Sequence, residues 1–136
     1  MTKPAGPHPL IATLEAATQG LLFPSETDAP LTPFFWPSEA KSLTPDLVLR
    51  LAGLPAGTAV STQDFDEFFA PVVTEEDWQN DEEKAEVRRF QALAKALKDN
   101  LKDVAVFRAG ETNISVFVVG KASGGFAGVA TRIVET

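Results

Sequence analysis

The chain has 136 residues, a formal net charge of −7 and no cysteine. Its length allows one compact domain but not two of ordinary size, and the lack of cysteine excludes disulfides, thiolate zinc sites and cysteine nucleophiles. The negative charge argues against direct binding of nucleic acid, because binding to a polyanion depends on Lys and Arg displacing counterions. We therefore expect a single acidic domain, monomeric on its own, whose partner is a basic or metal-bearing protein.

The first nine residues are rich in proline and glycine, and they predict a flexible tail ahead of one domain over residues 10–136. This tail lacks the basic and then apolar order of a secretory signal, and no apolar run approaches the roughly 20 residues of a membrane span. We therefore expect a cytoplasmic protein, unless a leader was removed. The single histidine, His8, lies between two prolines of the tail, so we expect nothing to position it for acid–base catalysis.

An amphipathic segment and an aromatic segment open the domain. Apolar side chains at helical spacing predict a helix from Leu10 to a stop at Gly20. Residues 31–36 are aromatic and β-favouring, which predicts a strand. Because Pro33 cannot donate a ladder hydrogen bond, this strand should lie at the edge of its sheet.

Two short helices are predicted from their start signals. Thr44-Pro45-Asp46 combines a hydroxyl cap, a proline at the first helical position and an acid in the first turn, and Gly53 ends this helix. Asp64 with Glu67 three residues later resembles a capping box and predicts the second helix. The phenylalanines of that second helix are Phe65, Phe68 and Phe69.

The clearest predicted element is a long amphipathic helix from Asp81 to about Leu101. Its apolar side chains repeat every three or four residues and form one stripe, at Val87, Phe90, Ala94, Leu97 and Leu101. Acids cluster at its start and lysines near its end, which complements the helix dipole at both ends. The acids Asp81, Glu82 and Glu83 are therefore typical of a helix N-terminus.

Three β-favouring segments end the chain, at residues 104–109, 114–120 and 126–134. Turn residues that include glycine separate them, which predicts an antiparallel meander. Within the middle segment the run from Val116 to Val119 is apolar on both faces, so both faces must be covered. We predict an α+β fold, an α/β/α sandwich around a mostly antiparallel sheet that comprises this meander and the edge strand near 31–36.

The sequence carries no strong enzyme signature. Gly120-Lys121 follows a strand but lacks the upstream glycine and the following hydroxyl residue of a phosphate loop. Asp77, Gln79 and Asp81 alternate like calcium ligands, but Glu82 occupies the position that needs glycine. Two carboxylates for glycoside hydrolysis depend on spacing in the fold, and acidity alone is poor evidence for them. We expect a protein that is not an enzyme and that has no cofactor of its own.

Trp78 lies inside a carboxylate-rich run, residues 74–83, and two interpretations are open. A tryptophan shortly before a helix start can be a staple that packs on the core. Alternatively, an exposed indole offers a large, stiff contact area, while the flanking carboxylates steer a basic partner toward it. From its residues alone, the sequence indicates an acidic domain that binds another protein.

Several motifs in one order resemble the nuclease A inhibitor family. They are Gly20 to Glu26, the aromatic strand ending at Trp36, Asp77-Trp78 with Asp81-Glu82-Glu83, Phe90-Gln91, Asn100-Leu101-Lys102, Val106 to Glu111, Val116 to Gly120, and the ending Ala127 to Thr136. The resemblance covers the chain from about residue 9 to its end. A set of separate motifs in one order is far more specific than any one of them.

The resemblance implies an α/β/α sandwich that binds and blocks the active site of a sugar-non-specific, magnesium-dependent nuclease acting on DNA and RNA. It further implies three contact residues. Glu26 would pair with a basic group that normally contacts the scissile phosphate, and Trp78 would be a hydrophobic anchor. Thr136 would reach the partner's Mg²⁺ through its C-terminal carboxylate or hydroxyl, as a metal ligand in the complex only.

The remaining acids of the implied surface are Glu75, Glu76, Asp77 and Glu135, which would hasten encounter with a basic cleft. An alternative stays open, in which an acidic interaction domain of the same fold binds a different basic partner. Without the resemblance, Glu26 is typical of an exposed turn and Thr136 of a frayed chain end.

Overall fold

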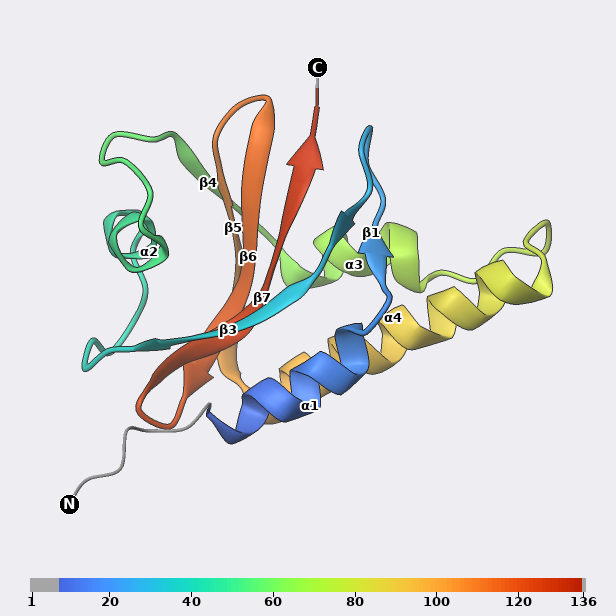
Figure 1. Cartoon of the computed structure of the whole chain (residues 1–136), viewed down its shortest axis with the longest axis horizontal. Helices are drawn as coiled ribbons and strands as arrows, with labels where there is room; N and C mark the ends of the chain where they lie inside the picture. The colour runs from blue at the N-terminus through green and yellow to red at the C-terminus, as the bar shows by residue number, and fades with distance from the viewer. Residues whose placement is uncertain (1–7, 136) are drawn as a thin grey trace.

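Within residues 8–135, which are the part of the chain that the computed structural model describes, four helices pack on a five-stranded antiparallel sheet (Figure 1). The strands of this sheet lie in the spatial order β3 (Thr32–Pro37), β7 (Gly125–Val134), β6 (Asn113–Ala122), β5 (Lys102–Ala109) and β4 (Val60–Gln63). A separate hairpin pairs β1 (Leu22–Phe23) with β2 (Ala29–Pro30). The predicted meander is confirmed as β5 to β7, and the predicted edge strand is confirmed as β3.

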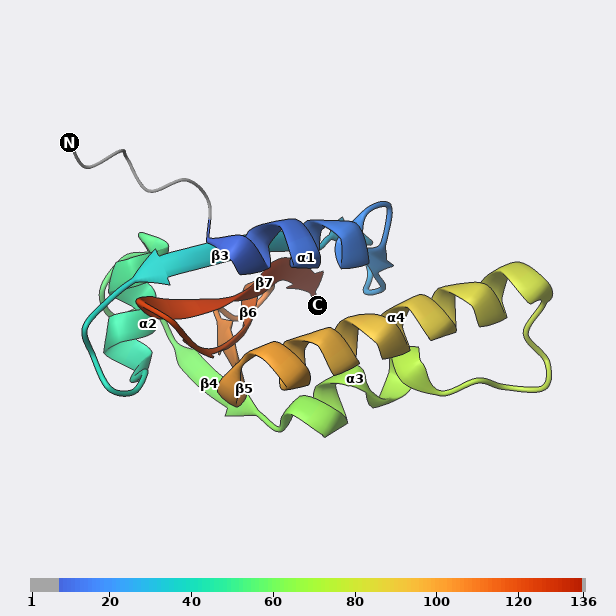
Figure 2. The same ribbon diagram turned by 90° about the horizontal axis from the view of Figure 1, so that it is seen from below.

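The helices cover both faces of the larger sheet, as Figures 1 and 2 show from two directions. One face carries α1 (Pro9–Thr18), α3 (Phe65–Val73) and α4 (Asp81–Asn100), and the other carries α2 (Pro45–Ala52). None of the helices in residues 8–135 is long and apolar enough to cross a membrane. The layers confirm the predicted α+β fold and its α/β/α sandwich.

Strand β6 explains why two helical layers are needed. Val116 and Val118 are fully buried in the large core beneath α1, α3 and α4. Phe117 and Val119, which alternate with them, are buried in a smaller core beneath α2. Because successive side chains of a strand point to opposite faces, the apolar run in β6 supplies both cores at once.

Local capping determines where the helices begin and end. The hydroxyl of Thr44 accepts a hydrogen bond from the Leu47 amide at 3.2 Å, and Gly53 ends α2 in the left-handed region at φ 73°. Asn80 and Glu83 form a reciprocal capping box at the start of α4. The predicted boundaries of α2 and α4 are therefore confirmed to within a residue or two.

Three short strands did not appear in the sequence prediction. Strand β4 has four residues, of which Val60 alone is apolar, and it pairs at the sheet edge with β5. The strands β1 and β2 have two residues each and flank a turn. Segments of two to four residues are too short to show a periodicity, so only their pairing partners define them as strands.

The expectation that nothing holds the His8 ring is wrong, while a catalytic role for it is not indicated by its contacts. The helix α1 begins at Pro9, and the imidazole Nδ1 of His8 caps it by accepting a hydrogen bond from the Leu10 amide at 3.2 Å. The Nε2 atom lies 3.0 Å from the carbonyl oxygen of Ser123, to which it donates, and the ring lies 4.6 Å from that of Phe35. Tertiary contacts thus position this histidine and fix its tautomer. The predicted tail reaches no further than residues 1–7, which lie outside the described part.

Candidate functional site

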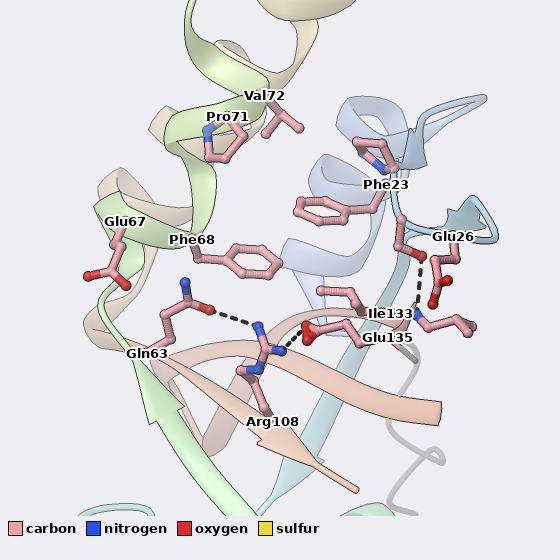
Figure 3. A pocket seen from close by; sticks show the side chains of 13 residues that line it. Phe23, Glu26, Gln63, Glu67, Phe68, Pro71, Val72, Arg108, Ile133 and Glu135 are labelled. Carbon is pink, nitrogen blue, oxygen red and sulfur yellow. Dashed lines mark hydrogen bonds and ion pairs between the residues drawn. The ribbon is translucent and has the colours of Figure 1, made fainter. Parts of the chain in front are cut away.

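A groove of about 580 Å³ lies between the β1–β2 hairpin, helix α3 and the end of strand β7 (Figure 3). The hairpin supplies Phe23 to Glu26, and α3 supplies Glu67, Phe68, Pro71 and Val72. The sheet supplies Gln63, Arg108 and the segment from Ile133 to Glu135. Segments far apart in the sequence therefore meet at this groove, and Glu26 and Glu135 line it together.

Ser25 ties the hairpin loop to the end of strand β7. Its hydroxyl oxygen accepts a hydrogen bond from the Val134 amide at 3.2 Å and donates to the Thr27 carbonyl at 2.8 Å. The Ser25 amide in turn donates to a carboxylate oxygen of Asp28 at 3.4 Å. These bonds hold exposed Glu26 beside the last residues of β7, so this predicted contact residue shares the groove with the segment from Ile133 to Glu135 (Figure 3).

Arg108 connects Gln63 and Glu135 on the side of the groove that the sheet forms. Its guanidinium donates to the side-chain oxygen of Gln63 at 3.1 Å and forms an ion pair with Glu135 (Figure 3). The Arg108 side chain is only 21% exposed, so this pair is screened less than an ordinary surface pair. The Glu135 amide also donates to the Thr112 carbonyl at 3.0 Å. Glu135 is thus fixed by its backbone and by its side chain.

The floor of the groove is aromatic and continuous with the large core. The ring of Phe23 stacks on that of Phe68 with centroids 4.6 Å apart, and it meets Phe90 edge-on at 6.2 Å. All three side chains are buried. The hairpin that carries Glu26 is therefore anchored to α3 and α4 by ring packing, as well as to β7 by hydrogen bonds.

Trp78 lies in the loop between α3 and α4 and is 74% exposed. The staple interpretation is therefore wrong, and the indole is exposed as the other interpretation requires. Its contact with a partner stays a prediction. Its neighbours Glu75, Glu76 and Asp77 are exposed as well. Local contacts hold this loop, since the Gln79 side chain accepts from the Glu76 amide at 2.9 Å and Arg88 pairs with Glu75 at 3.2 Å.

A second hollow, of about 280 Å³, connects the groove to this loop. Pro24, Pro71 and Val72 line both cavities, so the two share a wall. The rest of the second hollow is formed by Gln79, Glu82, Glu83, Glu86, Val87 and Phe90. Gln79 is the residue after Trp78. Glu26 thus lies at the first of two adjoining hollows, and Trp78 is next in sequence to a residue that lines the second.

Thr136, the predicted metal-reaching residue, lies outside the described residues. Among residues 8–135, the structure contains no group of three or more His, Asp or Glu side chains close enough to hold a metal ion.

The sequence interpretation missed Arg108 and Gln63, which shape the groove. In the sequence Arg108 belongs to a β-favouring segment and to the motif from Val106 to Glu111, neither of which assigns it a contact. A charged residue inside an otherwise apolar stretch of that strand was the available signal, but its partner Glu135 is 27 residues away. Only the register of β5 with its neighbours brings the two together.

The chain matches a known protein family. The family model described as NuiA, nuclease A inhibitor-like protein, matches residues 8–136, which is nearly the whole chain. No curated protein matches the chain. The matched range includes the groove, the exposed tryptophan and the chain end.

Proposed function

The chain belongs to the nuclease A inhibitor-like family, and we propose that it binds the active site of a sugar-non-specific, magnesium-dependent nuclease and blocks cleavage of DNA and RNA. The observation that carries this proposal is the groove at which Ser25 holds the Glu26 hairpin to Val134 and Arg108 holds Glu135, so that Glu26 and Glu135 line it together. Carboxylates gathered at one groove can replace the negative oxygens of a nucleic-acid phosphate. The family is one of inhibitors, and we propose no reaction for the chain itself.

In this proposal Glu26 engages a basic group of the nuclease that otherwise contacts the scissile phosphate. A bond between two charged groups is shorter and roughly twice as strong as a neutral hydrogen bond. The hairpin that carries Glu26 is already held by Ser25 and by Phe23. Binding therefore orders little backbone, and less of the interaction energy is lost to conformational entropy.

The chain end would supply an oxygen to the Mg²⁺ ion of the nuclease. Mg²⁺ prefers hard oxygen ligands and keeps positions for water or substrate phosphate. Carboxylate oxygens are of that kind, and Glu135 brings the chain to the edge of the groove. We assign the oxygen that reaches the ion to Thr136, while Glu135 is held by Arg108.

Trp78 would anchor the other end of the contact surface. A tryptophan contributes a large apolar area with few rotatable bonds, and it is a frequent hot spot of interfaces. The acids beside it, Glu75, Glu76 and Asp77, would raise the rate of encounter with a basic cleft. Their individual contributions to affinity should be small because exposed charges are well solvated.

The direct test is to titrate the chain into a magnesium-dependent, non-specific nuclease from the same host and to follow DNA cleavage. We expect cleavage to fall linearly and to stop near one inhibitor per enzyme. Full cleavage at excess inhibitor, with correctly folded protein, would contradict the proposal. In that case a pull-down from the host would test the alternative, an acidic domain of the same fold with a different basic partner.

A further inference from the structure

A third hollow, of about 270 Å³, lies on the α2 side of the sheet. Its floor is formed by Phe107, Val119 and Phe126, which belong to the smaller core and are each less than a tenth exposed. The groove beside the hairpin belongs to the opposite side of the molecule, where the large core lies. The two cavities share no lining residue.

Three lysines line the rim of this hollow, although the protein as a whole is acidic. They are Lys41, Lys102 and Lys121, and the carboxylate among the described lining residues is that of Asp103. None of the ion pairs found within residues 8–135 involves these lysines. Their positive charges are therefore balanced incompletely by the protein around them.

The pairing of β5 with β6 places two of these lysines at directly opposite positions on neighbouring strands. Lys102 is the direct cross-strand partner of Lys121, and like charges in that position destabilise a sheet. The ammonium of Lys121 donates to the Lys41 carbonyl at 3.2 Å, which holds it near the third lysine. An anion bound between these lysines would offset the repulsion among their ammonium groups.

The backbone beside the lysines is irregular. The register of β5 shifts between Lys102 and Ala105, and Asp103 within this bulge has φ 52°. The left-handed region is unfavourable for a residue with a side chain, although aspartate tolerates it better than most. Bulges of this kind are over-represented next to functional sites because they redirect side chains. Strain and like-charge repulsion thus coincide at one cavity.

We propose that this hollow binds a small organic anion with an apolar body, of the type of an aromatic carboxylate. Its volume of about 270 Å³ is just below the roughly 300–1,000 Å³ usual for ligand pockets, which suits a small ligand of one or two rings. The aromatic floor receives the apolar body, and the lysine ammonium groups receive the anionic head. Lysine is suited to this role because it is a compact, mobile point charge.

The probe for this site is 2-naphthoate, added to the full chain while backbone amide shifts are followed by NMR. We expect saturable shifts centred on Lys102, Gly120 and Lys121, with a dissociation constant of about a millimolar for so small a ligand. The neutral analogue 2-naphthol should bind at least several-fold more weakly. Shifts that do not saturate, or equal binding of 2-naphthol, would overturn the proposal.

Matched variants test the lysines. The double variant Lys41→Met/Lys102→Met keeps the aliphatic stems and should weaken 2-naphthoate binding roughly fivefold to tenfold, as expected for two partly exposed charge contacts. The control Lys84→Met/Lys95→Met removes the same charge from α4 and should leave binding unchanged. An equal loss of 2-naphthoate binding in the two double variants would show that overall charge causes the loss, and it would refute the proposed site.

A second variant tests the cavity without touching a charge. Ala105 lines the hollow and is half-buried, so Ala105→Leu fills part of its volume. We expect binding of 2-naphthoate to fall below detection while the amide spectrum remains that of a folded protein. Undiminished binding to folded Ala105→Leu would contradict the assigned cavity. None of these measurements depends on nuclease inhibition. A failure of this proposal can therefore be distinguished from a failure of the proposed function.

Discussion

The groove around Glu26 and the loop around Trp78 carry the proposed contact surface, but they are built differently. The groove is held by contacts between distant segments, since Ser25 bonds to Val134, which lies 109 residues away. The loop is held by contacts near in sequence, such as that of Glu76 with Gln79. A pre-organised groove loses little entropy on binding, whereas a loop of exposed side chains can adapt to its partner. We therefore expect the groove to determine affinity and the loop to add to it.

The largest effect should come from extending the chain beyond Thr136. Two to four added glycine and serine residues would displace the terminal carboxylate and place backbone in the groove. We expect inhibition to weaken about a hundredfold or more, as for loss of a buried charged contact. Thermal unfolding should be unchanged. The same extension before Met1 is the matched control, and equal potency of both extended chains would refute the role of the terminus.

Replacing the carboxylate of Glu26 should have the next largest effect. Glu26→Gln keeps the shape of the side chain but removes its charge, and we expect a loss of about 2 kcal/mol, or roughly 30-fold, in the inhibition constant. The control is Glu39→Gln, which changes an exposed acid in the connection between β3 and α2. A similar loss in both variants would mean that net charge, and not the groove, determines affinity.

Truncating the indole should cost less. Trp78→Ala removes a side chain that is 74% exposed, so the free energy of unfolding should stay within about 0.5 kcal/mol of the wild type. We expect inhibition to weaken roughly tenfold, as for an interface anchor of moderate strength. A loss larger than that of Glu26→Gln would reverse our ranking of groove and loop. Leu22→Ala, which truncates another exposed apolar side chain, serves as the control.

The smallest of these effects should come from Arg108, which positions Glu135 and does not contact the partner in our account. Arg108→Met keeps much of the stem but breaks the pair with Glu135 and the bond to Gln63. We expect inhibition to weaken a few-fold, with partial rescue in Arg108→Lys. In the chain extended beyond Thr136, Arg108→Met should cause no further loss. If the losses of inhibition from Arg108→Met and from the extension add fully, Arg108 acts on inhibition by a route that does not involve the chain end.

Local signals were sufficient to predict most of the fold. The apolar run of β6 predicted two covered faces, and Thr44-Pro45 and the acids after Asn80 predicted where α2 and α4 begin. These signals work because capping and side-chain alternation act within a few residues. Strand β4 was missed because it is defined by its pairing with β5 and not by its own residues.

The candidate site was less accessible to prediction. The exposure of Trp78 depends on how its loop leaves α3, which no local pattern determines. The contacts of Ser25 with Val134 and of Arg108 with Glu135 depend on the order of strands in the sheet. The resemblance named Glu26, but only the structure identifies the residues that hold its hairpin beside Val134 and Glu135.

The central claim is that the surface around the groove binds in the active site of a nuclease. Steady-state kinetics test this claim most directly. Inhibition should be measured at several DNA concentrations with a magnesium-dependent nuclease from the same host. Our account predicts competition, so that the apparent inhibition constant rises in proportion to the DNA concentration and the maximal rate is restored at saturating DNA. Inhibition that is independent of DNA concentration would contradict it, because the chain would then bind outside the active site.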